Sequence, residues 1–198
     1  MSNQLLWTKP VILKGDTVRL EPMTTAHIPY LAIAGKDKSI WKYMIYGDLS
    51  IAENMSAWVV EILRRQSTGS EMAFIIVLRE SRRVVGATRY MEMHPSHRSL
   101  EIGGTWISPE YHHSGVNTEC KYLLLKYAFE KMDCIRVQFK VDSRNIRSIQ
   151  AIESLGAVRE GVLRNHYILQ DGTVRDSVYF SILDREWPAA KDRLKKNL

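Results

Sequence analysis

The chain has 198 residues and a formal net charge of +6, with 45% hydrophobic and 25% charged residues, values typical of one globular domain, here 1–198. No apolar run approaches the roughly 18 residues of a membrane span, and residues 1–14 lack the pattern of a signal peptide, so we expect a cytoplasmic protein. Two cysteines, Cys120 and Cys134, are too few for a disulfide framework or a zinc site and are expected to be reduced core residues. The positive charge suits a polyanionic cofactor; no basic cluster with interleaved aromatic residues appears, which argues against nucleic acid as a partner.

The first third of the chain predicts one strand and two helices. The strand is expected at 17–21 and the first helix at 26–34. Ser50, with Glu53 three residues later, has the spacing of a capping box and predicts the start of the second helix, which extends to about Gln66.

Three strands then follow one another as a meander. They are expected at 72–78, 84–92 and 100–107, with a bulge at Gly86 in the second. Alternation in the third strand places Leu100, Ile102, Gly104 and Trp106 on one face, and Glu101, Gly103, Thr105 and Ile107 on the other. Because Gly103 and Thr105 are small, the face that carries the Glu101 carboxylate leaves room for a ligand.

The second half alternates helices with strands. A helix is expected after Gly115, with an apolar face and with Thr118, Lys121 and Lys126 opposite it. The strand at 135–141 follows this helix directly, so strand, helix and strand predict a crossover between parallel strands. The remaining elements are a helix at 145–155, a hairpin of 158–169 and 174–183 about Asp171-Gly172, and a terminal helix at 184–198.

The junction at 114–117, between the third meander strand and its helix, has the features of an anion site. The first backbone N–H groups of a helix have no intrahelical partner, and the helix dipole adds partial positive charge there. Gly115 permits a positive φ and a close approach of a ligand to the backbone, so these features together indicate a phosphate site. The alternative is a helix capped by Ser114 or Asn117 with Gly115 as a turn residue. The spacings of a P-loop and of a dinucleotide fingerprint are absent.

Residues 112–117, His-His-Ser-Gly-Val-Asn, resemble the acetyl-CoA-binding motif Gln/Arg-x-x-Gly-x-Gly/Ala of the GNAT acyltransferases. The central glycine matches, His112 stands in place of Gln/Arg, and Asn117 stands in place of the last Gly/Ala. The segments 142–148 and 155–161 resemble the family's later Asn-x-x-Ser and Leu-Gly-Phe/Ala segments at the right separation. The context of the motif, with Glu-Ile-Gly at 101–103, Trp106 and Thr-Glu-Cys-Lys-Tyr-Leu-Leu-Leu at 118–125, resembles the RimJ/RimL-like branch, which includes protein N-terminal acetyltransferases.

The resemblance implies the GNAT fold, an α/β (α+β) domain whose mixed, mostly antiparallel central sheet is flanked by helices, with a parallel strand pair at the cofactor site. It also implies an N-acyltransferase that moves an acetyl group from acetyl-CoA to a primary amine, which is a protein N-terminus, an amino acid or a small amine. The acceptor pocket is expected near the loops at 40–46 and 94–98.

The family's motifs also imply the site residues. The expected cofactor-binding residues are Trp106, Ile107, His112, His113, Ser114, Gly115, Val116, Asn117, Thr118, Asn145 and Ser148. Ser148 is further expected to protonate the CoA thiolate; the alternative interpretation of Ser148 is a solvent-facing helix serine. The alternative interpretation of Asn145 is a helix N-cap. Glu101 is proposed as general base, or else it orders substrate or is a surface carboxylate. Tyr167 falls near the position where RimL-like proteins carry an acidic candidate base, which leaves the mechanism and a ribosomal-protein substrate open.

No metal is expected, because the adjacent pair His112-His113 would rarely converge on one ion and no third ligand is evident nearby. Two other classes of function stay open. One is a non-catalytic CoA-binding protein of the GNAT fold that acts as a sensor or scaffold; the other is an RNA- or ribosome-associated basic protein. The oligomeric state is also open, a homodimer included.

Overall fold

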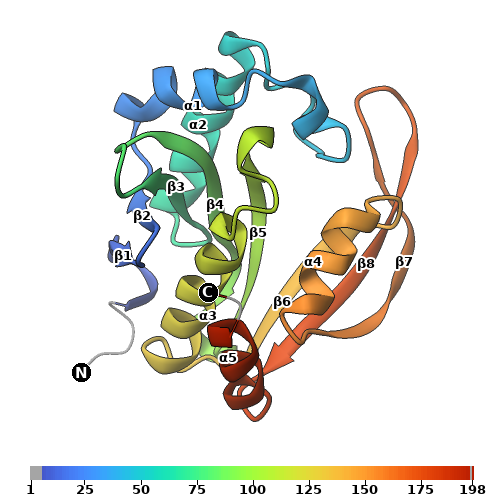
Figure 1. The fold of residues 1–198 in the computed structure, drawn as a ribbon. Helices are drawn as coiled ribbons and strands as arrows, with labels where there is room; N and C mark the ends of the chain where they lie inside the picture. Colours follow the sequence, from blue (N-terminus) through green and yellow to red (C-terminus); the bar gives the residue numbers. More distant parts are fainter. Residues whose placement is uncertain (1–5, 197) are drawn as a thin grey trace.

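The computed structural model describes residues 6–196 and 198, whose elements form one mixed sheet with helices on both faces (Figure 1). The sheet has eight strands in the order β1-β2-β3-β4-β5-β6-β8-β7, and every neighbouring pair is antiparallel except β5 with β6. The strands are β1 (Leu13–Lys14), β2 (Val18–Pro22), β3 (Met72–Leu78), β4 (Val84–His94), β5 (Ser99–Ile107), β6 (Arg136–Asp142), β7 (Val158–Ile168) and β8 (Val174–Leu183). The α-helices are α1 (Ile28–Ala34), α2 (Ala52–Ser67), α3 (Val116–Glu130), α4 (Ile146–Ser154) and α5 (Trp187–Lys196). The predicted α/β (α+β) class and the parallel pair are confirmed.

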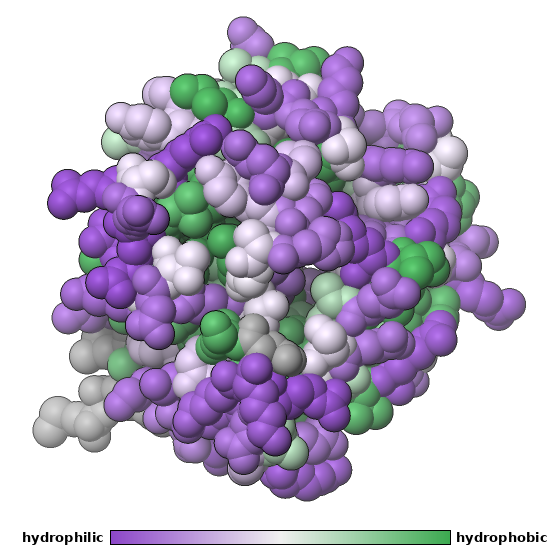
Figure 2. Space-filling view, in the orientation of Figure 1, coloured by the Kyte–Doolittle hydropathy of each residue, from purple (hydrophilic) through white to green (hydrophobic). Residues whose placement is uncertain are grey.

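Two hydrophobic cores hold the layers together. One core joins the sheet to α3, α4 and α5, and its fully buried members include Phe74, Tyr90 and Phe180. The other joins the opposite face of the sheet to α1 and α2 and contains Leu31 and Met55. Figure 2 shows that the outer surface in this view is mainly hydrophilic. No α-helix in the described part of the chain is long and apolar enough to span a bilayer.

The strand β5 carries a bulge that reverses which residues face which core. Opposite the single residue Thr88 of β4 lie two residues of β5, Gly104 and Thr105, and Gly104 has φ +56°. Ile102, before the bulge, belongs to the core against α3, whereas Trp106, after it, belongs to the core against α1 and α2. The prediction that both lie on one face is therefore wrong, because an extra residue shifts the two-residue alternation by one.

The parallel pair β5 and β6 opens after a short ladder. Its pairing runs from Ser99 with Arg136 to Glu101 with Gln138 and then stops, although both strands continue for several residues. Beyond this point β6 remains paired with β8, and β5 remains paired with β4 (Figure 1). The predicted crossover is confirmed, and the two diverging strands leave a row of backbone groups on β5 and β6 that face no neighbouring strand.

Of two local predictions, the capping box before α2 is wrong and the β7–β8 hairpin is confirmed. The α2 helix begins at Ala52 with Ile51 as its N-cap and no side-chain cap, since the Ser50 hydroxyl donates to the Asp48 carboxylate instead. The expected capping box at Ser50 is therefore wrong. The hairpin of β7 and β8 is confirmed, and Gly172 at its tip has φ +79°.

Both cysteines lie in the core as expected. Cys120 faces the sheet from α3, and Cys134 precedes β6; both are free and buried. Burial raises the pKa of each thiol to about 12.

Candidate active site

The loop from β5 to α3 presents an open helix N-terminus. Gly115 is the N-cap residue of α3, with φ 82° and ψ −18°, and no side chain caps the helix. A Cβ placed on Gly115 would meet no heavy atom within 4 Å. The first N–H bonded within this helix is that of Glu119, to the Gly115 carbonyl, which leaves the N–H groups of Val116, Asn117 and Thr118 without an intrahelical partner.

The flanking residues of this loop are fixed by the protein itself. The Ser114 hydroxyl donates to the Tyr111 carbonyl at 2.7 Å, so it is not the cap of α3. His113 is exposed with φ +62°. The side chain of Val116 is buried in the core. The protein therefore engages the Ser114 hydroxyl and the Val116 side chain, while the His113 side chain stays exposed.

His112 links this loop to the first turn of α4. Its Nδ1 lies 2.8 Å from the Arg147 guanidinium and its Nε2 lies 3.2 Å from the Ile107 carbonyl. Because a guanidinium only donates, Nδ1 accepts and Nε2–H donates. Burial, with Arg147 next, lowers the His112 pKa, which favours this neutral form. Both ring nitrogens are thus engaged, and the free positive charge beside the loop belongs to Arg147, a residue that sequence reasoning missed.

The first turn of α4 holds Asn145 and Ser148. The Asn145 Oδ1 accepts the Ser148 backbone N–H at 3.1 Å, so Asn145 is the N-cap of this helix. The bond fixes the side-chain amide of Asn145, whereas it does not use the hydroxyl of the half-buried Ser148. The predicted alternative role of Asn145 is therefore present, and it leaves a second polar group on the same residue for a ligand.

Trp106 and Ile107 at the end of β5 are both buried, in opposite cores. Their side chains pack inside the protein, so only their backbone groups could meet a ligand in the opening between β5 and β6.

Glu101 is a buried carboxylate with protein partners. It is 2% exposed, accepts a hydrogen bond from Gln138 Nε2 at 3.1 Å, and lies 3.4 Å from Lys140 Nζ. Thr105, which was expected on the same face, instead points toward α3 because of the bulge. Burial alone would lower the Lys140 pKa, but the Glu101 carboxylate and Tyr167 outweigh it, and the pKa is raised. Lys140 is therefore a charged partner of Glu101.

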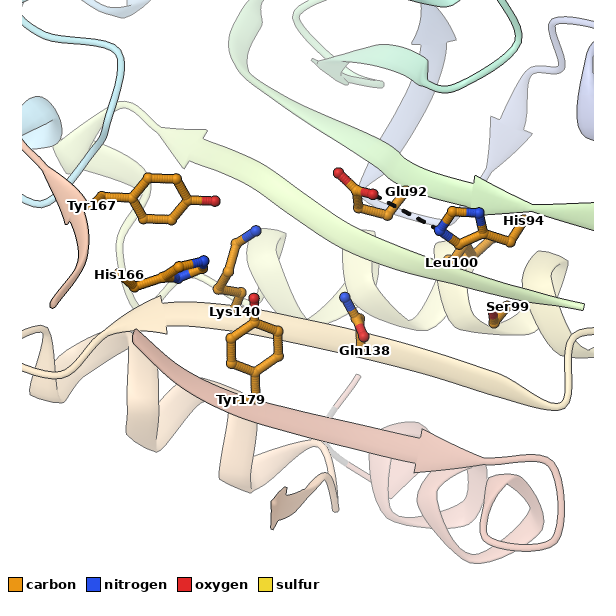
Figure 3. A pocket seen from close by; sticks show the side chains of 9 residues that line it. All are labelled: Glu92, His94, Ser99, Leu100, Gln138, Lys140, His166, Tyr167 and Tyr179. Atoms are coloured by element: carbon orange, nitrogen blue, oxygen red, sulfur yellow. Dashed lines mark ion pairs between the residues drawn. The ribbon is translucent and has the colours of Figure 1, made fainter. Parts of the chain in front are cut away.

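A cavity of about 310 Å³ lies next to this ion pair (Figure 3). Its lining residues come from β4, β5, β6, β7 and β8, and they are Glu92, His94, Ser99, Leu100, Gln138, Lys140, His166, Tyr167 and Tyr179. The Lys140 amine extends into the cavity between Tyr167 on one side and Glu92 on the other. Of the two loops expected to shape the acceptor pocket, the 94–98 loop contributes His94, whereas His166, Tyr167 and Tyr179 of the wall come from the β7–β8 hairpin, of which the sequence analysis singled out only Tyr167.

Two ionic side chains of α3 are buried, contrary to the ordinary behaviour of such residues. The Glu119 carboxylate accepts the backbone N–H groups of residues 16–18 and so points away from the open helix end. The Lys121 ammonium donates to Thr105 Oγ1 beside the bulge of β5. Burial lowers its pKa to about 8. The expectation of an exposed Lys121 is wrong, because its amine reaches Thr105 on β5 instead of solvent.

The fold and this site together define the class of protein as an acyltransferase. In the site, a parallel strand pair opens beside a free helix N-terminus. Residues 17–158 match the family model described as the acetyltransferase (GNAT) domain, and the chain belongs to this family. In the described part of the chain, no three His, Cys, Asp or Glu side chains are grouped as metal ligands would be.

Individual relatives agree with this assignment. The chain is 27% identical over 178 residues to the uncharacterized N-acetyltransferase p20 of Bacillus licheniformis, which covers 88% of this chain and 97% of that protein. It is 22% identical to the spermidine N(1)-acetyltransferase of Escherichia coli K12, over 88% of this chain and 90% of that protein. The solved structure of a candidate acetyltransferase from T. thermophilus matches with a TM-score of 0.86 and 38% identity, over 97% of this chain and 99% of that one.

Proposed function

We propose that the protein transfers the acetyl group of acetyl-CoA to a primary amine, which is a protein N-terminus, an amino acid or a small amine. The observation that carries this proposal is the opening between β5 and β6, which lies beside three unpartnered N–H groups and the open face of Gly115. Family membership supports the reaction class. We also propose a single domain over 1–198, the RimJ/RimL-like branch and, since both cysteines are free thiols, a cytoplasmic location.

The phosphate groups of CoA suit the N-terminus of α3. The N–H groups of residues 116–118 are donors at the positive end of the helix dipole, and a ligand can approach Gly115 without a side chain in its way. Arg147, held by His112, adds a permanent positive charge at the side of the loop. His113, Ser114, Asn117 and Thr118 would border the phosphates.

The pantetheine arm would run along the opening. Its amides could pair with backbone groups of Trp106 and Ile107 on β5 other than the Ile107 carbonyl, which accepts from His112, and with the side-chain amide of Asn145 at the start of α4. This direction places the thioester near the bulge at Gly104 and Thr105. A bulge releases backbone groups from the ladder, so an N–H there is a candidate donor for the developing negative charge on the thioester oxygen.

The reaction forms a C–N bond from the amine to the acetyl carbon and breaks the C–S bond, so the amine loses a proton and the thiolate gains one. We assign Ser148 as the donor to the thiolate. Glu101 is assigned as acceptor of the amine proton, directly or through water, and acts while it contacts Lys140 and Gln138.

A second function is favoured by that same contact. Because Glu101 is already paired with Lys140, the site could hold CoA without an available base, and the protein would then be a non-catalytic sensor or scaffold. The two functions differ in one measurable respect, which is whether free CoA appears only when an amine is added.

Titration calorimetry with CoA and acetyl-CoA, followed by mass spectrometry of the amines, tests the proposal. We expect saturable binding of both, and amine-dependent release of CoA together with an acetylated product. Absence of CoA binding would overturn both functions. Binding without an acetylated product, across N-terminal peptides, amino acids and small amines, would favour the non-catalytic function.

A further inference from the structure

Among the residues that line the cavity beside Glu101, Lys140 and Glu92 are the fully charged ones, and Lys140, with 12% of its side chain exposed, is the more deeply buried of the two. The Lys140 amine extends into this cavity. Glu101 is not among the lining residues, and its carboxylate is already paired with Lys140. Glu92 lies at the mouth, where its side chain is 60% exposed. An acceptor with several ammonium groups would therefore bring a like charge against the largely buried Lys140 amine.

The same cavity offers donors for an oxygen anion. An ammonium group has three N–H donors, and Glu101 needs only one of those on Lys140. The hydroxyl groups of Tyr167 and Tyr179 line the same space. His166 stacks on Tyr167 with ring centres 4.1 Å apart, and its buried Nδ1 has no hydrogen-bond partner among the described residues. These groups converge on the volume next to the Lys140 amine.

The position of Lys140 in β6 orients an acceptor. It lies two residues beyond Gln138, the last residue of β6 that is paired with β5, so its amine is next to the opening. An anion bound by Lys140 would place an amine a few bonds away at that opening, where the thioester is proposed to lie. A volume of about 310 Å³ is at the small end of ligand pockets and suits a compact acceptor.

We propose that the acceptor is a small amine that carries a carboxylate or phosphate group a few bonds from its nitrogen, as an α-amino acid does, and that Lys140 binds this anion. The inference rests on the proposed acetyl transfer and specifies its acceptor. It disfavours polyamines, although one relative is a spermidine acetyltransferase.

The test compares acceptors that differ only in the anion. Glycine is compared with glycinamide, and O-phosphoethanolamine with ethanolamine, with spermidine as the polycation; the value of kcat/KM is measured at saturating acetyl-CoA. The two pairs distinguish a carboxylate from a phosphate. Charge-assisted hydrogen bonds predict a preference of about tenfold or more for the anionic member of at least one pair.

Variants of Lys140 assign the preference to this side chain. Lys140→Gln keeps a donor for Glu101 but removes the charge, and it should lower the preference by about tenfold, whereas Lys140→Arg should retain it. Comparing the ratio between variants cancels differences in amine basicity. Lys126→Gln, on the exposed side of α3, is the matched control and should leave the ratio unchanged. Should Lys140→Gln lose turnover, the Kd values of N-acetylglycine and N-acetylglycinamide are measured by calorimetry, and the ratio of the two Kd values replaces the ratio of kcat/KM.

The outcomes separate the two proposals. Turnover of spermidine or of the neutral amines at least as efficient as that of their anionic partners overturns the acceptor class and leaves acetyl transfer intact. An unchanged ratio in Lys140→Gln overturns the role of Lys140. Failure to acetylate any amine overturns the proposed function and this inference with it.

Discussion

Replacing Gly115 by alanine should weaken CoA binding far more than it weakens the fold. The residue has φ +82°, a conformation that costs an L-residue about 1–2 kcal/mol. A new Cβ would contact nothing within 4 Å in the protein, so backbone strain is the whole cost to stability. For a chain of this size, about 1 kcal/mol corresponds to a fall in Tm of roughly 2–4 °C.

The effect on binding has a different origin. The open space above Gly115 is where a phosphate would approach the N–H groups of residues 116–118, and a methyl group there displaces it. Losing one hydrogen bond to a charged group costs about 1.5–3 kcal/mol, so the Kd for CoA should rise at least about tenfold.

Gly172 supplies the matched control for this experiment. It has φ +79°, its Cβ would also meet nothing within 4 Å, and it lies at the tip of the β7–β8 hairpin. Gly172→Ala should therefore lower Tm by a similar amount and leave the Kd unchanged. Both variants are measured by calorimetric titration with CoA and by thermal unfolding. A wild-type Kd for Gly115→Ala, or an equal rise in Kd for both variants, would refute the reasoning.

Three further predictions concern α3 and α4. Burial lowers the pKa of Lys121 to about 8, so in alkaline solution the unfolded chain binds one more proton than the native one. Between about pH 8 and 10.5, the free energy of unfolding of the wild type should then rise by roughly 3 kcal/mol relative to that of Lys121→Met. Chemical denaturation measures both proteins, and parallel pH profiles of the two would contradict this. Glu119→Ala leaves the N–H groups of residues 16–18 without their acceptor and should cost roughly 3 kcal/mol in urea unfolding; a loss below about 1 kcal/mol would show that water replaces the carboxylate. Ser148→Ala keeps the N-cap bond, which uses the backbone N–H, and should lower kcat roughly 100-fold with the KM for acetyl-CoA unchanged; an unchanged kcat removes the assigned role.

Local chemistry made much of the fold predictable. The change of hydrophobic period around Gly115 located the strand, the loop and the start of α3, and the short link from α3 to β6 required a parallel crossover. The positive φ of Gly115 follows from the same local signal. Each of these features depends on residues close together in the chain.

The remaining features depend on contacts between distant residues. The bulge at Gly104 reverses the faces of β5, and simple alternation could not reveal it. Lys121 is buried because its amine meets Thr105 of β5, which the bulge at Gly104 turns toward α3. Arg147 acquires its place through His112, and the charge near Glu101 is set by Lys140 on another strand. No local pattern encodes such partners.

The burial of both cysteines has a practical consequence for colorimetric work. In the native state, Cys120 and Cys134 are shielded and remain protonated at neutral pH, so a disulfide reagent such as Ellman's should count the sulfhydryl of released coenzyme with little background. Denaturant would expose both side chains at once, and the same yellow product would then report two equivalents per polypeptide.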